Sequence, residues 1–185
     1  MVRKRAAKPK GARRKLDDYE TPSVDTERVC RFIKFRGPIL EPASGSGRMA
    51  RALLTWAGKK VTTADLKRGQ DFLKRTKIWK GDIITNPPYH KGMADAFVQH
   101  ALKLADGRVA MLLEIKYLAG QKRAKFYNTC KPEAVIVIPN RVYFFAGGKQ
   151  ITSQFYSHCW VVWPSRTLRG KGTRTEIYWA EDEYG

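Results

Sequence analysis

The stretch that most constrains this chain is residues 82–89, DIITNPPY, an apolar run that stops at two consecutive prolines. Proline fixes φ and has no N–H donor, so the chain beyond Ile84 cannot continue as a paired strand. The pattern therefore predicts a short buried strand that ends in a stiff, surface-facing turn. This turn presents the amide of Asn86, the carbonyls of the prolines and the ring of Tyr89. We interpret it as an active site.

The polar groups of this turn suit a flat base with an exocyclic amine. The oxygen Oδ1 of Asn86 and the carbonyl of Pro87 would each accept one N–H of the amine, while the Tyr89 ring stacks on the base. Drawing the nitrogen lone pair away from the ring in this way favours methyl transfer to that nitrogen. The alternative is a Pro-Pro loop beside a core tyrosine.

Residues 86–89 resemble the catalytic motif of S-adenosylmethionine-dependent amino-methyltransferases. This class includes the N6-adenine methyltransferases of DNA and RNA and the glutamine methyltransferases of release factors. The resemblance implies a catalytic role for Asn86, Pro87, Pro88 and Tyr89. It also implies that Asn86 borders the cofactor and that Tyr89 contacts the target base.

Residues 38–47, PILEPASGSG, predict a short strand that runs into a glycine turn. Glycine permits positive φ and a close approach of a ligand to the backbone, and an acid at the strand end can bind an ammonium or hydroxyl group. A Gly-x-Gly pair alone is weak evidence, and the third glycine of a dinucleotide site is missing. The segment resembles the methyltransferase cofactor loop, which implies cofactor contacts from Glu41, Pro42, Ala43, Gly45 and Gly47.

Two further segments follow the cofactor pattern in order. Residues 60–66 read as a second strand that ends in Asp65, which is placed to hold ribose hydroxyls, with Leu66 packing on the cofactor adenine. An ordinary solvent-facing aspartate is the alternative. By resemblance, Asp71 contacts the adenine amine and Phe72 packs beside it. Upstream, Tyr19, Thr21 and Pro22 resemble the Thr-Pro segment that closes over the methionine end of the cofactor.

The second half of the chain is similar to the small adenine methyltransferases common in phages and prophages. The matching segments are residues 117–127 (YLAGQKRAKFY), 141–144 (RVYF) and 160–163 (WVVW). In such enzymes the aromatic residue of the Arg-x-x-Phe segment packs against an extruded base. This implies a target-base contact by Phe144, with Phe145 as the alternative register and a core phenylalanine as the competing interpretation.

The alternation of strand and helix patterns predicts an α/β fold, a Rossmann-like class I methyltransferase sheet flanked by helices. We expect it to be mostly parallel with an antiparallel C-terminal hairpin. Helical spacing over residues 93–104 predicts a helix whose apolar residues serve as core contacts. Buried strands are expected at residues 108–115, 134–138 and 157–163, and a short strand at residues 176–179. Residues 147–149 read as a loop.

The charge balance points to a polyanionic partner. Lys and Arg number 36 against 17 Asp and Glu, a formal charge of +19 that favours nucleic acid, with DNA preferred over RNA. No basic amphipathic membrane helix is evident. The expected phosphate contacts are Arg3, Lys4, Arg5, Arg13, Arg14, Lys15, Lys122, Arg123, Arg141, Lys149, Arg166, Arg169 and Lys171.

We expect three parts: a disordered basic arm over residues 1–16, a single catalytic domain over residues 17–180, and a tail over residues 181–185. No insertion after Tyr89 is large enough for a separate target-recognition domain, which predicts relaxed sequence preference. The three cysteines and three histidines lack metal-ligand spacing, so we predict no metal and reduced thiols. A cytoplasmic location is the default, and the oligomeric state stays open.

The sequence thus favours methyl transfer from S-adenosylmethionine to the N6 amine of adenine in DNA. An RNA adenine methyltransferase is the first alternative, since the same motif and charge would serve it. A glutamine methyltransferase is disfavoured, because little chain precedes the glycine loop and a charge of +19 suits a polyanion. A basic nucleic-acid-binding protein with an inactive methyltransferase fold is the third alternative.

Overall fold

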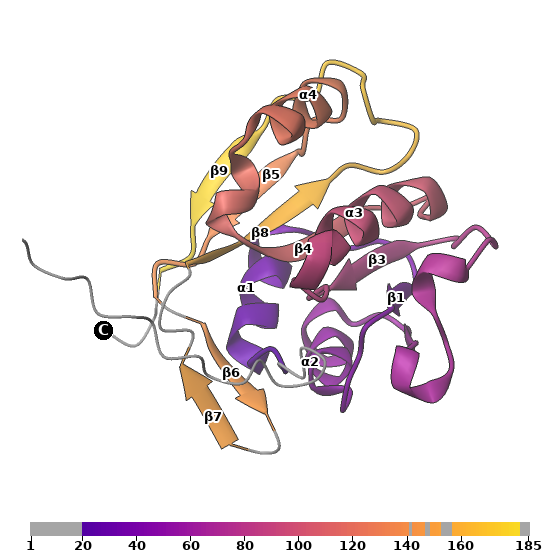
Figure 1. Ribbon diagram of the computed structural model, residues 1–185, viewed down its shortest axis with the longest axis vertical. Coiled ribbons are helices and arrows are strands. Elements are labelled where there is room, and N and C mark those ends of the chain that lie inside the picture. Colours follow the sequence, from indigo (N-terminus) through magenta and orange to yellow (C-terminus); the bar gives the residue numbers. More distant parts are fainter. Residues whose placement is uncertain (1–19, 141, 147–148, 153–156, 182–185) are drawn as a thin grey trace, which may run out of the picture.

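The computed structural model describes residues 20–140, 142–146, 149–152 and 157–181. These residues form a seven-stranded sheet in the order β2-β1-β3-β4-β8-β5-β9 (Figure 1). The strands are β1 (Ile39–Glu41), β2 (Val61–Thr63), β3 (Asp82–Thr85), β4 (Val109–Glu114), β5 (Ala134–Val137), β8 (His158–Trp163) and β9 (Glu176–Trp179).

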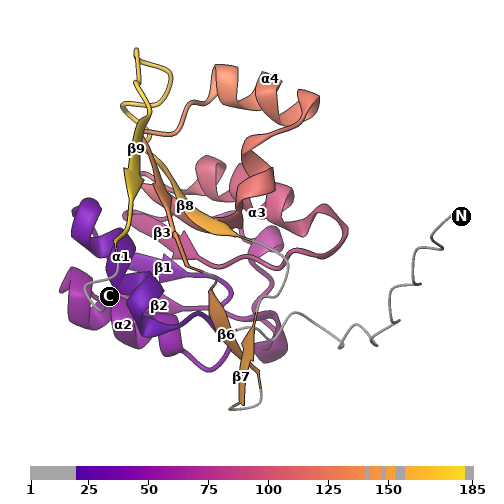
Figure 2. The same cartoon turned by 90° about the vertical axis from the view of Figure 1, so that its left-hand side faces the viewer.

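Helices cover both faces of this sheet. Figure 2 shows α1 (Ser23–Phe32) and α2 (Arg48–Ala57) on one side, and α3 (Met93–Leu104) and α4 (Gln121–Thr129) on the other. Each face has its own apolar core, because strands buried on both faces send alternate side chains to opposite sides. Ile84, Leu112 and Trp160 lie in one core, whereas Ile83, Leu113 and Trp163 lie in the other.

The predicted α/β class, a mostly parallel sheet flanked by helices, is confirmed, but the last two strands of the sheet do not form the expected antiparallel hairpin. Strands β2, β1, β3 and β4 are parallel, β8 is antiparallel to both of its neighbours, and β9 pairs in parallel with β5. The strand β5 therefore separates β8 from β9. All six residues of β8 are buried, so this strand fits the sheet interior, while the more exposed β9 takes the edge.

A second, two-stranded sheet was missed by the sequence reading. The antiparallel strands β6 (Tyr143–Ala146) and β7 (Lys149–Thr152) form it between β5 and β8 in the chain. Figures 1 and 2 show this hairpin projecting from the main sheet beyond α1 and α2. Backbone hydrogen bonds of 2.8 and 3.0 Å join Glu20 to Phe145 and fix the hairpin to the segment before α1.

Helix α1 follows directly on the Thr21-Pro22 segment. The helix begins at Ser23, and Pro22 occupies its cap position. Thr21 is buried. Val29 and Ile33 are buried against the sheet, whereas Phe32 is 37% exposed at the end of the helix.

At the amino edge of the parallel strands, Asp82 ties several chain segments together. Its carboxylate accepts hydrogen bonds from the backbone N–H groups of Arg36, Gly37 and Arg108, at 3.0, 3.2 and 2.7 Å. The neighbouring Gly81 packs so closely on the Pro38 carbonyl that a Cβ atom there would overlap it. These contacts fix the spacing of β1, β3 and β4, whose opposite ends carry the polar residues of the candidate site.

Candidate active site

A cavity of about 450 Å³ lies at the carboxyl edge of β1, β2 and β3. In a parallel sheet this edge collects the loops that follow each strand, which explains why segments distant in sequence meet there. The cavity brings together thirteen of the residues predicted to act: Thr21, Glu41, Pro42, Ala43, Gly45, Asp65, Leu66, Asp71, Phe72, Asn86, Pro87, Pro88 and Tyr89. Pro22 and Gly47 do not line it, and Tyr19 lies outside the described residues.

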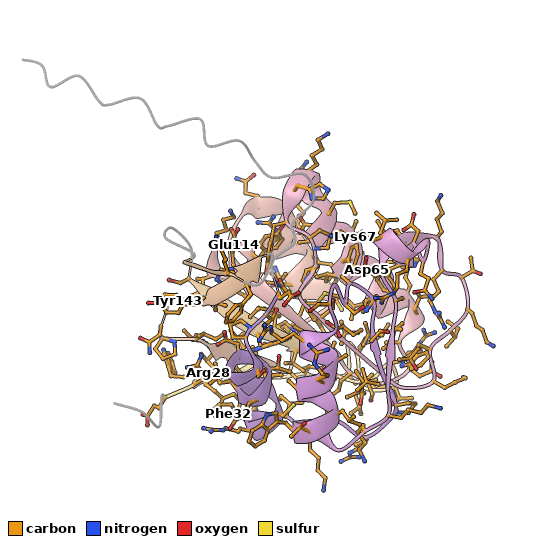
Figure 3. All side chains as sticks on the ribbon, turned by 90° about the horizontal axis from the view of Figure 1, so that it is seen from below. Arg28, Phe32, Asp65, Lys67, Glu114 and Tyr143 are labelled. Atoms are coloured by element: carbon orange, nitrogen blue, oxygen red, sulfur yellow. The ribbon has the colours of Figure 1, made fainter. Side chains whose placement is uncertain are left out.

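The glycine loop after β1 is held against the end of β2. The N–H of Gly45 donates to Asp65 Oδ2 at 2.7 Å, and the N–H of Lys67 donates to Asp65 Oδ1 at 2.9 Å. Gly45 and Gly47 have φ values of 50° and 84°, which a residue with a side chain rarely adopts. The carboxylate of Asp65 is thereby fixed at the cavity wall. In Figure 3, Asp65 and Lys67 lie together on one side of the molecule.

Glu41, at the end of β1, is only 2% exposed although it lines the cavity. Its Oε2 atom has no hydrogen-bond partner within the described part of the chain. Burial raises the pKa of this carboxyl from its ordinary 4.5 to about 8, with a smaller contribution from Asp65, while Arg68 and Arg51 act to lower it. A buried acceptor of this kind suits a cationic ligand group, which would satisfy its oxygen and ionise it.

The segment before α1 forms another wall of the cavity through Glu20, which the sequence reading missed. Partial burial acts to raise the pKa of Glu20, but hydrogen bonds from Ser46 and Arg48 outweigh it and the pKa is lowered. Arg48 Nε lies 3.1 Å from Glu20 Oε2, and the guanidinium stacks 4.2 Å from the centre of the Phe145 ring. Arg48, the first residue of α2, thus links this helix to both Glu20 and the β6–β7 hairpin.

Apolar side chains line the part of the cavity beyond β2. Leu66 is exposed on its wall, and Phe72 is buried with its ring centre 5.0 Å from that of Phe97. Asp71 accepts a hydrogen bond from the N–H of Leu73 at 3.0 Å, which orients its carboxylate. Met93 and Phe97 were expected to be core contacts alone, yet both line the cavity. A flat apolar group with polar edges fits these surroundings.

The turn that follows β3 carries Asn86 and Tyr89 in direct contact. Tyr89 Oη lies 2.6 Å from Asn86 Oδ1 and 2.7 Å from the carbonyl oxygen of Leu112 in β4. A phenol has one proton and cannot donate to two acceptors at once. Because the two ends of an amide are assigned from their partners, the consistent arrangement has Tyr89 donating to Leu112 and accepting from the Asn86 nitrogen.

Aromatic residues from β8 and the turn after β4 surround Tyr89. Its ring centre lies 6.0 Å from that of His158 and 6.5 Å from that of Tyr117. Phe144, predicted to contact a target base, is 5% exposed and does not line the cavity; its ring packs edge-on to His158 at 5.1 Å. The alternative residue Phe145 is half-buried beneath Arg48, which does line the cavity.

The expected phosphate contacts are scattered over the molecule. Lys122 and Lys149 are exposed, on α4 and on the hairpin. Arg123 instead pairs with both carboxylate oxygens of Asp95, at 3.0 Å each, and stacks on the Tyr117 ring. Outside the described residues lie Arg3, Lys4, Arg5, Arg13, Arg14, Lys15 and Arg141.

The loop after β8 lies at the opposite edge of the sheet from the cavity. This follows from the register, because Trp163 at the end of β8 pairs with Val109 at the start of β4. Arg166 and Arg169 donate hydrogen bonds there to backbone carbonyls at the end of α3, and the exposed Lys171 lies in the same loop. These three residues therefore lie apart from the cavity, and their contact with phosphates stays a prediction.

Several cavity residues were missed by sequence reasoning because they belong to no motif. They are Glu20, Ser44, Ser46, Arg48, Met49, Lys67, His90, Met93 and Phe97. Only the position of Ser44 and Ser46 within the glycine loop offered a local signal. Across the described ranges, no group of three His, Cys, Asp or Glu residues could hold a metal ion, and no helix is long and apolar enough to cross a membrane.

No family model matches this sequence, and no curated protein does. Solved structures give the similarity. A Pyrococcus horikoshii protein assigned as an RNA methyltransferase superposes with a TM-score of 0.51 at 10% identity, over 84% of this chain and 91% of that chain. A methyltransferase subunit of a type I restriction-modification system from Streptococcus thermophilus gives 0.50 at 14% identity, over 82% and 46%.

A dimethyladenosine transferase from Plasmodium falciparum is similar to the same degree. Its TM-score is 0.51 at 16% identity, over 80% of this chain and 63% of that chain. The chain therefore spans less than half the length of the restriction-modification subunit and under two thirds of the transferase. At these identities the similarity concerns the fold alone, which this chain shares with methyltransferases.

Proposed function

We propose that this protein transfers a methyl group from S-adenosylmethionine to the N6 amine of adenine in nucleic acid, with DNA preferred over RNA. One observation carries the proposal. A single cavity joins the Asn86–Tyr89 turn to three acids, Glu41, Asp65 and Asp71, which follow the pattern of a nucleoside site with an ammonium group at one end.

Different cavity residues would bind different parts of the cofactor. Asp65 would hold the ribose hydroxyls, Leu66 and Phe72 would enclose the adenine with Asp71 at its amine, and Glu41 would face the ammonium. The buried, unpartnered oxygen of Glu41 supports this arrangement, because it needs a donor that the described residues do not supply. When bound, S-adenosylmethionine supplies a methyl group on a positively charged sulfur, open to attack by a nitrogen lone pair.

The Asn86–Tyr89 turn would hold the substrate amine. In the orientation set by Tyr89, the Asn86 carbonyl oxygen turns away from the phenol, and it would accept one N–H of the amine while the Pro87 carbonyl accepts the other. The two prolines keep these acceptors in place. The catalytic contribution is therefore alignment and polarisation of the nitrogen rather than proton abstraction.

Nucleic acid is favoured as the substrate by charge and by the shape of the fold. The net charge is +19, and a base buried in duplex DNA would have to be flipped out to reach the cavity, at a cost of about a few kcal/mol. Among the described residues, the β6–β7 hairpin is the one element that projects beside the site beyond the sheet and its helices. So small a projection supports binding through phosphates with relaxed sequence preference.

The experiment uses labelled S-adenosylmethionine with duplex DNA, single-stranded DNA and RNA of matched sequence. We expect the highest rate on DNA, and label confined to RNA would replace the DNA preference with the RNA alternative. The Asn86→Ala variant should lose turnover by at least about 100-fold while calorimetry still detects S-adenosylhomocysteine binding. Normal methylation by this variant would refute the assignment of the catalytic turn.

A further inference from the structure

Strand β9 forms one outer edge of the seven-stranded sheet and, within the described ranges, pairs only with β5 (Figure 2). On that inner side, the N–H of Glu176 donates to Glu133 and the N–H of Ala180 donates to Val137, each at 2.9 Å. Along a strand, backbone groups point alternately to the two sides. The N–H and C=O groups of Ile177 and Trp179 therefore point outward, away from β5.

Apart from the exposed Glu176 at its first position, the side chains along this edge are apolar on both faces of the sheet. Ile177 is 55% exposed and Trp179 is 63% exposed. Both side chains lie on the same face of the sheet as Val135 and Val137, their pairing partners in β5. On the other face, Tyr178 packs against Phe32 with ring centres 4.9 Å apart. Protein edges that stay unpaired are usually guarded by charged side chains, above all lysine, by proline or by a bulge. Strand β9 contains no lysine, proline or bulge, and its one charged residue, Glu176, stands at its first position.

The charges around β9 are self-complementary, in contrast to the positive excess of the whole chain. Lys171 and Arg174 precede the strand, Glu176 is its first residue and Glu181 follows it, all exposed. If two copies of the strand run antiparallel, Arg174 of one copy lies close to Glu181 of the other and offsets the approach of Glu176 to the same carboxylate. A parallel arrangement would place like charges together instead.

We propose that two copies of this chain associate through antiparallel pairing of β9, which joins their sheets into one. A twofold axis at Tyr178 places Ile177 opposite the partner's Trp179. These are the residues whose backbone groups point outward, so each pair exchanges two hydrogen bonds. The same register packs Ile177 against the partner's Trp179 on one face of the joined sheet.

The contact is short, because β9 contains four residues. Stable interfaces commonly bury about 800 Å² per partner, so this association should be weak and depend on protein concentration. It uses the edge farthest from β1 and β2, and it does not depend on the methyltransferase activity proposed above. Either proposal can fail while the other holds.

Sedimentation velocity of the full-length, nuclease-treated protein tests the proposal over about 1 to 200 µM. We expect a reversible monomer–dimer equilibrium. Ile177→Pro removes an outward N–H and no bond to β5, so it should raise the dimer dissociation constant by at least about tenfold. Trp179→Lys should act in the same direction, whereas Leu54→Lys, at an equally exposed site on α2, should leave the equilibrium unchanged.

A charge exchange tests the antiparallel direction. Arg174→Glu and Glu181→Arg should each weaken the dimer, and the double variant should restore it. Circular dichroism and thermal melting establish that each variant is folded. A wild-type protein that stays monomeric over the whole range would overturn the proposal, as would a dimer that neither β9 substitution weakens.

Discussion

The hydroxyl of Tyr89 lies 2.6 Å from the Asn86 side chain and 2.7 Å from the carbonyl of Leu112. Leu112 belongs to β4, so the sheet itself fixes the phenol, and the phenol in turn sets which end of the Asn86 amide faces it. Tyr89 thus orients the Asn86 amide, in addition to the contact with a target base that we propose for it.

Tyr89→Phe isolates that orienting role, because it retains the ring and removes only the hydroxyl. We expect kcat to fall about tenfold, the equivalent of one lost hydrogen bond, while the affinity for S-adenosylhomocysteine is unchanged. Tyr143→Phe, at an exposed position on the hairpin, is the matched control and should retain full activity. Wild-type kcat in Tyr89→Phe would show that the amide is oriented by other contacts.

Glu41→Gln should have opposite effects on two properties: it should stabilise the fold and weaken cofactor binding. Burial raises the pKa of Glu41 from 4.5 to about 8, so the native state keeps a proton that the unfolded chain loses between these values. Wild-type stability therefore falls as pH rises through this window, and the glutamine variant should avoid that loss. Urea unfolding should show the variant gaining stability relative to wild type between pH 5 and pH 9.

The same substitution should weaken binding of S-adenosylhomocysteine, whose ammonium group would lose its anionic partner. Calorimetry of the wild type should show affinity rising with pH up to about 8, because ammonium binding requires Glu41 to release its proton. Equal affinities of wild type and Glu41→Gln across this range would mean that Glu41 does not face the ammonium.

Reversing two exposed positive charges at predicted phosphate contacts should weaken nucleic-acid binding more than reversing two at the opposite edge of the sheet. Lys122→Glu with Lys149→Glu should raise the dissociation constant for duplex DNA and reduce its salt dependence. The control is Lys60→Glu with Lys103→Glu, which makes the same change in net charge at the opposite edge of the sheet. Fluorescence anisotropy at several salt concentrations measures both. Equal effects of the two pairs would mean that binding has no preferred face.

Gly81→Ala tests the close packing at the amino edge of β3. A Cβ atom would overlap the Pro38 carbonyl, so we expect a loss of about 1–3 kcal/mol in the free energy of unfolding. The neighbouring Lys80→Ala removes an exposed ion pair with Asp106 and should change the free energy of unfolding much less than Gly81→Ala does. Urea denaturation measures the free energy of unfolding of both variants. A Gly81→Ala variant as stable as the wild type would show that the backbone at this edge can relax.

Local patterns in the sequence were enough to predict most of the sheet and the polar residues at its edge. The helix over residues 93–104 and the strand over residues 176–179 match their predicted bounds. The cofactor segments meet as expected, because the loops after parallel strands share one edge. These features depend on periodicity and on residues close together in the chain.

The features that were missed depend on contacts between distant residues. Glu20 reaches Arg48 and Phe145 through tertiary packing, which no local pattern records. The position of β5 between β8 and β9 was not predicted either, because strand order depends on pairing between residues that are distant in the chain. The β6–β7 hairpin did carry a signal, since Gly147-Gly148 is a typical two-residue turn between strands, but it was interpreted as a loop.

The most direct test of the central claim is the identity of the methylated nucleoside. Unmethylated duplex DNA is incubated with S-adenosylmethionine and either the wild-type protein or Asn86→Ala, then digested to nucleosides and analysed by mass spectrometry. N6-methyladenine with the wild type, and a loss of at least about 100-fold with the variant, is the predicted result. Methyl transfer to another base, or equal yields from both proteins, would contradict the account.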